Sequence, residues 1–378
     1  MMDALVIGGT GPTGPLVVEG LLDRGYRVTI FHSGQHEADF TRPVEHLHGD
    51  PHFRETVDEI LGTRCFELVV CMYGRLRIIA DAVRDRTERF IAISGAAGYA
   101  APSDPGWGPL GRSLAPDEEG IWQTEPGLDK FNYLLHLSEE SVLEAHHEGA
   151  YNATIVRPSL MYGPRVPAPQ DWCIIRRILD GRKRMIIADG GLKVEARIYV
   201  ENVAAAVLVA VDKPRESAGK RFNVRDQHLY TLRQRVEFIA AHMGHELELV
   251  DIPYDLAKPC HVLWRHNRAH RVIDDTRIRS ELGYRDAVTA REAIPRATEW
   301  LLEHRPLRGG EEEMQLGDPF DYAAEDQFIR AWEQGKVSVG NISFSVPSPA
   351  HPYRHPKTPG EAWRRPESSS YHRSESKQ

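Results

Sequence analysis

Short apolar segments alternate with amphipathic segments over the first 160 residues of the chain. The apolar runs have the composition of buried strands, whereas the segments between them repeat apolar residues at helical spacing. The expected strands are Leu5 to Ile7, Val28 to Phe31, Val44 to Leu47, Phe66 to Met72, Phe90 to Ser94 and Ala153 to Arg157. The expected helices follow Gly14 and cover Phe53 to Leu61, Leu76 to Val83 and Leu128 to His147. This alternation predicts an α/β fold with six parallel strands and helices on both faces of the sheet.

Beyond residue 160 the predicted elements become shorter and more mixed. We expect a helix over Val203 to Val211, a short strand over Phe222 to Val224, and helices over Leu232 to Met243 and residues 296 to 304. The predicted organisation is therefore a domain of residues 1–160, a smaller mixed domain of residues 161–305 that is partly interleaved with the first, and a C-terminal tail of residues 306–378. From Pro347 the tail is rich in Pro, Ser, Arg and His, which predicts a partly disordered or surface-clamped segment.

Three glycines follow the first expected strand with a spacing of three residues. Gly8, Gly11 and Gly14 stand between that strand and the first expected helix, and a second strand comes next. Glycines at these positions allow a tight turn, the close approach of a pyrophosphate, and contact between helix and strand, while the helix N-terminus attracts the anion. The pattern predicts the opening βαβ unit of a Rossmann-type doubly wound sheet and a nicotinamide cofactor.

Composition and charge exclude several classes of protein. A hydrophobic content of 41% supports a large core, and a formal net charge of −8 disfavours nucleic-acid binding, which needs a basic face. The four cysteines form no C-x-x-C pair, which favours free thiols in a reducing compartment. The first expected strand leaves no room for a signal peptide, and no apolar run approaches the length of about 18 residues that a membrane span needs. We therefore expect a cytoplasmic protein that has no membrane partner.

Several motifs occur in the order of a known family. They are Gly8-x-x-Gly11-x-x-Gly14, Gly49-Asp50, Ile93-Ser94 with Tyr99 following, Arg157 to Arg165, Tyr199 to Ala204, Asp275 to Arg277 and Glu281 to Tyr284. Together they resemble the extended short-chain dehydrogenase/reductase superfamily, and within it the NAD-dependent epimerase/dehydratase family. The resemblance covers roughly residues 3 to 305. It implies a Rossmann-type domain with a smaller interleaved C-terminal substrate domain, a small-molecule substrate and a homodimer formed through the helices that contain Leu76 and Leu128.

The resemblance also implies which residues hold the cofactor, NAD or NADP. Gly8, Thr10, Gly11, Pro12, Thr13 and Gly14 would hold the pyrophosphate. Asp50 would reach the adenine, Cys71, Met72 and Tyr73 would line the ribose, and Pro158 would lie beside the nicotinamide. An alternative for Asp50 is an ordinary Asx turn after Gly49. His32 and Ser33 end the second strand, where an acid would favour NAD and an arginine NADP, so the choice between the two cofactors stays open.

The catalytic positions depart from the family pattern of Tyr-x-x-x-Lys with a Ser or Thr. One alignment places Phe131 and Leu135 at the Tyr and Lys positions, and the other places Tyr133 and Leu137 there. Without a neighbouring cation, a tyrosine phenol ionises at about pH 10 and is a poor base at neutral pH. Two interpretations follow. Either Tyr133 acts as acid/base with help from Ser94 or His136, or the chain binds a dinucleotide without this chemistry.

The substrate side is also atypical. The family often holds a substrate phosphate with an Arg five residues before the Val of its Tyr-x-x-Val-x-Asp stretch, and here Glu195 takes that place, with Arg197 nearby as a substitute. The leading prediction is an NAD(P)-dependent oxidoreductase of the epimerase/dehydratase type acting on a carbinol or carbonyl carbon of a small polar substrate. The alternative is a non-catalytic NAD(P)-binding redox sensor or scaffold. RNA binding, known among relatives, is disfavoured by the acidic charge. We predict no metal site, since His266, His270 and Asp274 lack a helical context.

Overall fold

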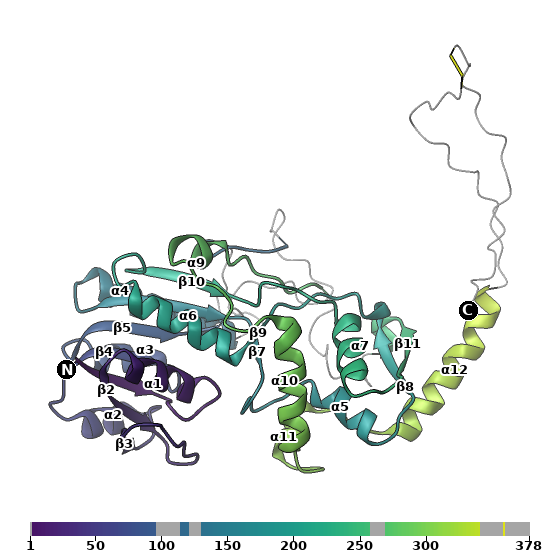
Figure 1. The fold of residues 1–378 in the computed structure, drawn as a ribbon, viewed down its shortest axis with the longest axis horizontal. Coiled ribbons are helices and arrows are strands. Elements are labelled where there is room, and N and C mark those ends of the chain that lie inside the picture. The colour runs from purple at the N-terminus through teal and green to yellow at the C-terminus, as the bar shows by residue number, and fades with distance from the viewer. Residues whose placement is uncertain (1, 96–113, 121–129, 258–268, 341–357, 360–378) are drawn as a thin grey trace. The chain divides into compact units, whose positions relative to one another are not determined.

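A seven-stranded parallel sheet is the centre of the fold, in a computed structural model that describes residues 2–95, 114–120, 130–257, 269–340 and 358–359 (Figure 1). Its strands are β1 (Met2–Ile7), β2 (Tyr26–His32), β3 (Glu45–His48), β4 (Phe66–Cys71), β5 (Thr87–Ile93), β6 (Asn152–Pro158) and β10 (Lys220–Val224). They lie in the order β10-β6-β5-β4-β1-β2-β3, and every neighbouring pair is parallel. The order reverses between β1 and β4, which is the doubly wound arrangement that the sequence predicts.

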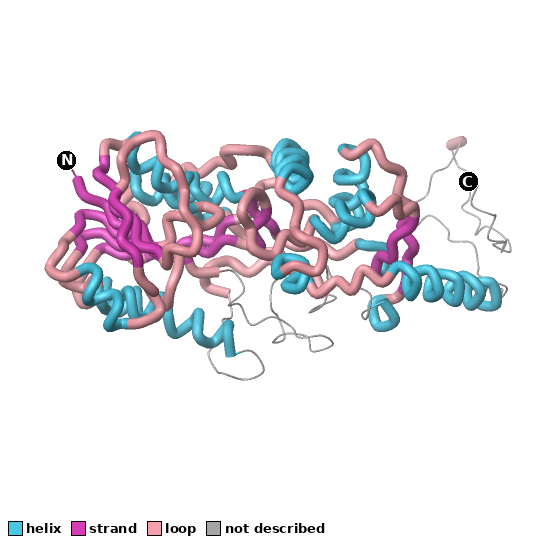
Figure 2. Tube along the Cα trace, turned by 90° about the horizontal axis from the view of Figure 1, so that it is seen from below, coloured by secondary structure: helices cyan, strands magenta, loops and turns pink. Residues whose placement is uncertain are grey.

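Helices cover both faces of this sheet, as Figure 2 also shows. One face packs against α1 (Gly14–Asp23), α6 (Val200–Asp212) and α9 (Thr276–Glu281). The other packs against α2 (Arg54–Leu61), α3 (Leu76–Ala82) and α4 (Lys130–His147). Successive residues of β1 explain the two cores, because Ala4 and Val6 point to the first face and Leu5 and Ile7 to the second. Strands that are buried on both faces are continuous apolar runs in the sequence, which is why the sequence pattern predicted them.

The sheet contains one strand more than the six predicted. We expected Phe222 to Val224 to be a short strand, but as β10 it extends the central sheet by pairing with β6, with Lys220 opposite Thr154 and Val224 opposite Pro158. Strand β10 thus joins a sheet whose other strands come from residues 2–158, and residues 1–320 form one compact unit.

The rest of the second region contains two small parallel sheets and several helices. The sheets pair β7 (Leu160–Tyr162) with β9 (Arg197–Tyr199), and β8 (Arg184–Ala188) with β11 (Glu248–Ile252). The helices are α5 (Trp172–Leu179), α7 (Leu232–His242), α8 (Tyr254–Ala257) and α10 (Ala290–Glu303), with a short 3-10 turn over Asp189–Gly191. Helix α10 begins six residues before the predicted start at residue 296, because Thr289 and Glu292 form a capping box.

Two helices lie in the part of the chain that we assigned to the tail. Helix α11 (Glu311–Leu316) belongs to the compact unit that ends at Phe320, whereas α12 (Tyr322–Gly340) belongs to a second unit that begins at Asp321. None of the helices in the described part of the chain has the length and hydropathy that crossing a membrane requires.

Candidate functional site

The glycine turn connects β1 to α1, and its three glycines meet different surroundings. Gly8 has a φ of +92°, and a Cβ there would lie 2.5 Å from the Cβ of Tyr73. A Cβ on Gly14 would lie 2.3 Å from the backbone carbon of Gly9. Among the described residues, a Cβ on Gly11 would meet only the Gly8 carbonyl oxygen, at an ordinary contact distance of 3.8 Å. The described structure therefore requires glycine at positions 8 and 14 but leaves room for a side chain at Gly11.

The same turn leads into a helix N-terminus that carries no acidic side chain. Helix α1 begins at Gly14, has a proline in its first turn, and contains no Asp or Glu there. The Thr13 hydroxyl does not cap the helix and instead contacts the Met72 sulfur at 3.6 Å. Thr10 and Pro12 complete the turn between Gly8 and Thr13. The positive end of the helix dipole is thus left for an anion from outside the helix.

The parallel strands bring most of the other predicted cofactor residues to one edge of the sheet. His32 ends β2 and Ser33 follows it, Asp50 follows β3, Cys71 ends β4 and is followed by Met72 and Tyr73, and Pro158 ends β6. Because carboxyl ends of parallel strands share an edge, these residues and the glycine turn after β1 lie along the same side of the sheet. The structure brings together residues that are up to 150 positions apart in the sequence.

The segment after β4 packs closely against the glycine turn. The Met72 amide donates to the Ile7 carbonyl at 2.9 Å, and the Tyr73 side chain, 46% exposed, lies against Gly8. The buried Cys71 thiol donates weakly to the Tyr73 carbonyl, and burial raises the pKa of this thiol to about 12. Cys71 is therefore a packing residue at neutral pH, while Tyr73 is exposed at this edge.

Asp50 forms the Asx turn that we weighed as its alternative role. Its Oδ1 accepts the His52 amide at 2.9 Å and lies 2.7 Å from His52 Nδ1. The backbone hydrogen bond from His52, and then its side chain, lower the pKa of the Asp50 carboxyl. The side chain is exposed, so one carboxylate oxygen remains accessible from solvent.

The candidate catalytic residues come from two different elements. Ser94 directly follows β5, and its buried Oγ has no hydrogen-bond partner in the described residues. Ser159, just after β6, has a second buried Oγ of this kind. Tyr133 is half-buried on α4, and no hydrogen bond connects it to Ser94. Two unsatisfied hydroxyls at the carboxyl edge are a notable feature, since buried polar groups are normally paired. Tyr99 lies outside the described residues.

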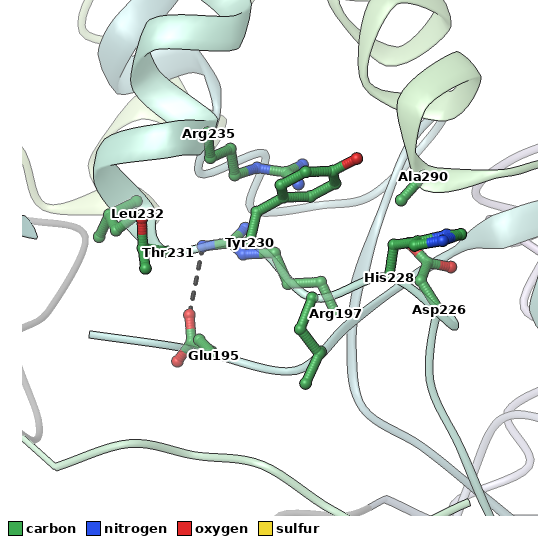
Figure 3. Close-up of a pocket in the computed structure, with 10 residues that line it drawn as sticks. Glu195, Arg197, Asp226, His228, Tyr230, Thr231, Leu232, Arg235 and Ala290 are labelled. Atoms are coloured by element: carbon green, nitrogen blue, oxygen red, sulfur yellow. Dashed lines mark hydrogen bonds and ion pairs between the residues drawn. The ribbon is translucent and has the colours of Figure 1, made fainter. Parts of the chain in front are cut away.

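The predicted substrate residue Arg197 lines a separate pocket in the second region (Figure 3). Its guanidinium donates to Gln170 at 2.8 Å and to Glu195 at 3.2 Å, and burial lowers its pKa. Arg235 from α7 lines the same pocket and forms a bidentate pair with the buried Asp171, at 2.7 and 2.6 Å. The two arginines bring positive charge to the pocket, but carboxylates of the chain already neutralise much of it.

The comparison with protein families identifies the fold as that of a known group. The model of the NAD dependent epimerase/dehydratase family matches residues 4–224, which includes the glycine turn and all seven strands apart from the first two residues of β1.

The chain belongs to this family.

Individual relatives are more distant. A chloroplast stem-loop binding protein of 41 kDa from Arabidopsis thaliana is 25% identical over 244 residues, a match that covers 60% of this chain and only 59% of the plant protein. Among solved structures, UDP-glucose 4-epimerase from Thermotoga maritima with UDP-glucose covers 81% of this chain and 100% of its own, at 18% identity and a TM-score of 0.65. dTDP-glucose 4,6-dehydratase from Bacillus anthracis with NAD covers 81% and 98%, at 16% identity and a TM-score of 0.62. These likenesses establish the epimerase/dehydratase fold.

Within this epimerase/dehydratase fold, the structure also brings together polar residues that the sequence analysis did not connect, although Tyr162 and Asn202 stand in two of its motifs. Asp226 accepts the Tyr162 hydroxyl at 2.7 Å and the Asn202 side-chain amide at 2.8 Å, and burial raises the pKa of this carboxyl. The Arg235 guanidinium lies 4.2 Å from the centre of the Tyr162 ring. No local pattern signals this cluster, because its members come from β7, α6, α7 and the loop after β10. His270 accepts the Val194 amide, and Asp274 the Thr276 amide, while His266 and residues 351–357 lie outside the described residues.

Proposed function

We propose that the chain is an NAD(P)-dependent oxidoreductase of the epimerase/dehydratase type that acts on a carbinol or carbonyl carbon of a small polar substrate. The observation that carries this proposal is the room for a side chain at Gly11. Among the described residues nothing requires a glycine there, since the nearest described atom to a Cβ would be the Gly8 carbonyl oxygen, at 3.8 Å, and the residue has no positive φ. A bound pyrophosphate that needs this space, beside the N-terminus of α1, explains the missing side chain.

The remaining cofactor residues follow from their places along the carboxyl edge. Gly8, Thr10, Pro12, Thr13 and Gly14 would surround the pyrophosphate. Residues further along the edge would face the other groups of the cofactor, which are His32, Ser33 and Asp50 for the adenosine, Met72 and Tyr73 for the ribose, and Pro158 for the nicotinamide. The buried Cys71 would line the ribose site only through its backbone. When bound, a nicotinamide cofactor supplies the hydride acceptor or donor.

The chain's own chemistry would then concern one proton. The Ser94 Oγ, which has no partner within the described structure, would donate a hydrogen bond to the substrate oxygen. The Tyr133 Oη would hold the proton that this oxygen gains or loses. Arg197 would bind a polar group of the substrate only after exchanging part of its contact with Glu195. We also infer a cytoplasmic location and a homodimer.

A specific observation favours the alternative, a dinucleotide-binding redox sensor or scaffold that does no chemistry. Leu135 and Leu137 on α4 stand where the family pattern has lysine, so neither alignment gives Tyr133 or Phe131 a neighbouring cation four residues on. A phenol without that cation is a weak base at neutral pH. Binding of the dinucleotide is common to both functions, and only turnover separates them.

Binding is tested first, with Gly11→Val. Purified protein is denatured to identify any nucleotide that it carries, and the stripped protein is titrated with NADH and NADPH. We expect micromolar binding of one of them and a loss of at least about tenfold in Gly11→Val, because a side chain fills the space for the pyrophosphate. Gly335→Val is the matched control, since it makes the same change on α12 and no described atom lies within 4 Å of a Cβ built there. Equal binding by wild type and Gly11→Val would contradict the proposal.

Turnover is tested next, with Tyr133→Phe. If Tyr133 is the acid/base, the variant keeps its affinity for the dinucleotide and loses at least about a hundredfold in kcat, the usual contribution of general acid–base catalysis. Turnover is measured with candidate polar alcohols and ketones as substrates. Absorbance at about 340 nm reports the oxidation state of the dinucleotide. Unchanged turnover in Tyr133→Phe would remove Tyr133 from the mechanism, and absence of turnover in the wild type would favour the sensor.

A further inference from the structure

Three histidines lie together at the carboxyl end of the edge strand β3 and its neighbour β2. The parallel register places His32 opposite His48 and Ile30 opposite His46. Because residues two apart on a strand point to the same face, His46 and His48 share a face with each other and with His32. Their ring centres are 4.7 Å apart for His32 and His48, and 5.3 Å apart for His32 and His46.

One carboxylate from the loop after β2 meets all three rings. Glu37 Oε2 lies 3.0 Å from His46 Nδ1 and 3.9 Å from His32 Nε2, while its Oε1 lies 3.2 Å from His48 Nε2. His32 Nε2 and His46 Nδ1 are 3.3 Å apart. One nitrogen of each ring and a Glu37 oxygen all lie within 4.8 Å of one another. The four side chains thus converge on one point.

We propose that His32, Glu37, His46 and His48 form a binding site for one divalent transition-metal ion, with Zn²⁺ as the best match. Zinc is bound by imidazole nitrogens and carboxylate oxygens at about 2.0 to 2.2 Å in a tetrahedron, whose corners are then about 3.4 Å apart. The four printed separations of 3.0 to 3.9 Å are close to those edges, and the four ligand atoms all lie within 4.8 Å of one another, so small side-chain movements would close the tetrahedron around an ion. Three imidazoles and one carboxylate also match the ligand preference of zinc over Mg²⁺ or Ca²⁺.

The buried ring of His32 could bind a metal if its hydrogen bond with the Gly34 amide were broken. His32 is 2% exposed, and the neutral form of its imidazole would offer one nitrogen lone pair to a metal. The Gly34 amide donates to His32 Nδ1 at 3.2 Å. When Nε2 binds a metal, Nδ1 carries the proton of the ring, so this contact must open and the loop after β2 must shift locally.

A phosphate group is a second kind of ligand that the three histidine rings could bind. The end of β2 is where dinucleotide-binding folds contact the adenosine ribose, and three imidazoles could receive a 2′-phosphate there. Glu37 argues against that occupant, because its carboxylate lies within 3.2 Å of two of the rings and would repel a phosphate. The same carboxylate attracts a cation. The metal site does not depend on dinucleotide binding. The sequence prediction of no metal considered His266, His270 and Asp274, whereas these four residues are brought together by strand register and a loop, which spacing along the chain does not reveal.

The test uses the full chain, stripped with a chelator and titrated with Zn²⁺ against a fluorescent competitor. We expect one Zn²⁺ per chain, confirmed by elemental analysis after dialysis, and intense visible absorption bands when Co²⁺ replaces it in a tetrahedral site. His48→Ala and Glu37→Gln should each weaken binding by at least about tenfold, since loss of an outer contact alone costs about that much. Both side chains are more than half exposed, so the variants should fold, which circular dichroism checks.

His36→Ala is the matched control, because His36 is an exposed histidine beside Glu37 that is not one of the four ligands. It should bind Zn²⁺ as the wild type does, and Zn²⁺ should raise the Tm of both but not of His48→Ala. Failure of the wild type to bind Zn²⁺ at micromolar concentration overturns the proposal, as does equal loss in His36→Ala. Tighter NADPH binding by Glu37→Gln without any Zn²⁺ binding by the wild type would assign the cluster to a 2′-phosphate instead.

Discussion

At the scale of single residues, the described cysteines differ in their access to solvent. Cys65 is exposed, whereas Cys71 and Cys173 are buried. Burial raises the pKa of the Cys71 thiol to about 12 and that of Cys173 well above its ordinary value. Since the thiolate is the reactive form and burial blocks access, we expect iodoacetamide at about pH 8.5 to label Cys65 and to leave Cys71 and Cys173 unmodified. Peptide mass mapping measures the labelling of each site.

The pH dependence has a definite sign. A raised thiol pKa keeps Cys71 almost entirely protonated between about pH 7 and 9, so its labelling should stay very slow over that whole range. Urea serves as the control, because unfolding exposes every thiol and should make all labelling rates similar. Rapid labelling of Cys71 in the folded protein would show that the β4 edge opens to solvent.

Residues at the carboxyl edge could be predicted because the apolar strands that precede them are visible in the sequence. Gly8, His32, Asp50 and Ser94 each follow a run whose length and composition identify a buried strand. By contrast, Glu37 belongs to a loop without periodicity, and nothing local indicates that it contacts His46 and His48. Contacts set by strand register or loop path are beyond what spacing along one chain can reveal.

At the scale of elements, a buried ion pair connects α5 to residues 317–320, which directly follow α11. Arg177 donates to both carboxylate oxygens of Asp318, at 2.5 and 2.9 Å, and both side chains are almost fully buried. Arg177→Met would leave the Asp318 carboxylate buried without its cation. We expect the free energy of unfolding to fall by about 3 to 5 kcal/mol, measured by urea denaturation followed by circular dichroism.

A matched variant in the same region is Arg308→Ala. Arg308 also pairs with an aspartate of this region, Asp180, but its side chain is 69% exposed. Solvent screens such pairs, so this variant should lose about 1 kcal/mol or less. A loss in Arg177→Met no larger than that in Arg308→Ala would mean that residues 317–320 do not depend on α5 for their position.

Elements with strong periodicity were predicted, and those defined by distant partners were not. The six expected strands, from β1 to β6, are all present, with bounds that shift by up to three residues. Strand β10 was predicted as an element but not as the seventh strand of the sheet, since its place depends on hydrogen bonds to β6, which lies about 60 residues earlier. Helices α11 and α12 were missed, because we assigned everything after residue 305 to a tail.

At the scale of the whole molecule, the homodimer implied by the family resemblance stays a prediction. Helices α3 and α4 lie side by side on one face of the sheet, and Phe131 near the start of α4 is 65% exposed. An exposed aromatic on that helix is consistent with a covered face. We expect light scattering to give twice the chain mass of 42.7 kDa, and Phe131→Glu to shift the protein toward the monomer.

Leu192→Glu is the control for this shift, because Leu192 is equally exposed, at 63%, but lies in the second region. It should leave the mass unchanged. A wild-type mass of 42.7 kDa across the concentrations tested would rule out the dimer, and dissociation by both variants would point to a general effect of added charge rather than to an α4 interface.

The net charge of the whole chain bears on the likeness to a chloroplast stem-loop binding protein. Binding of RNA depends on cations that contact phosphates and release counterions. This chain has a formal charge of −8, and several of its exposed arginines already pair with carboxylates, such as Arg54 with Asp58 and Arg64 with Glu45. We therefore expect no saturable binding of a labelled stem-loop RNA at about 150 mM salt, measured by fluorescence anisotropy.

The full chain is needed for this measurement, because residues 347–378 are rich in Arg and His. Micromolar binding that survives at this salt concentration would contradict the argument from charge and would extend the likeness from sequence to function.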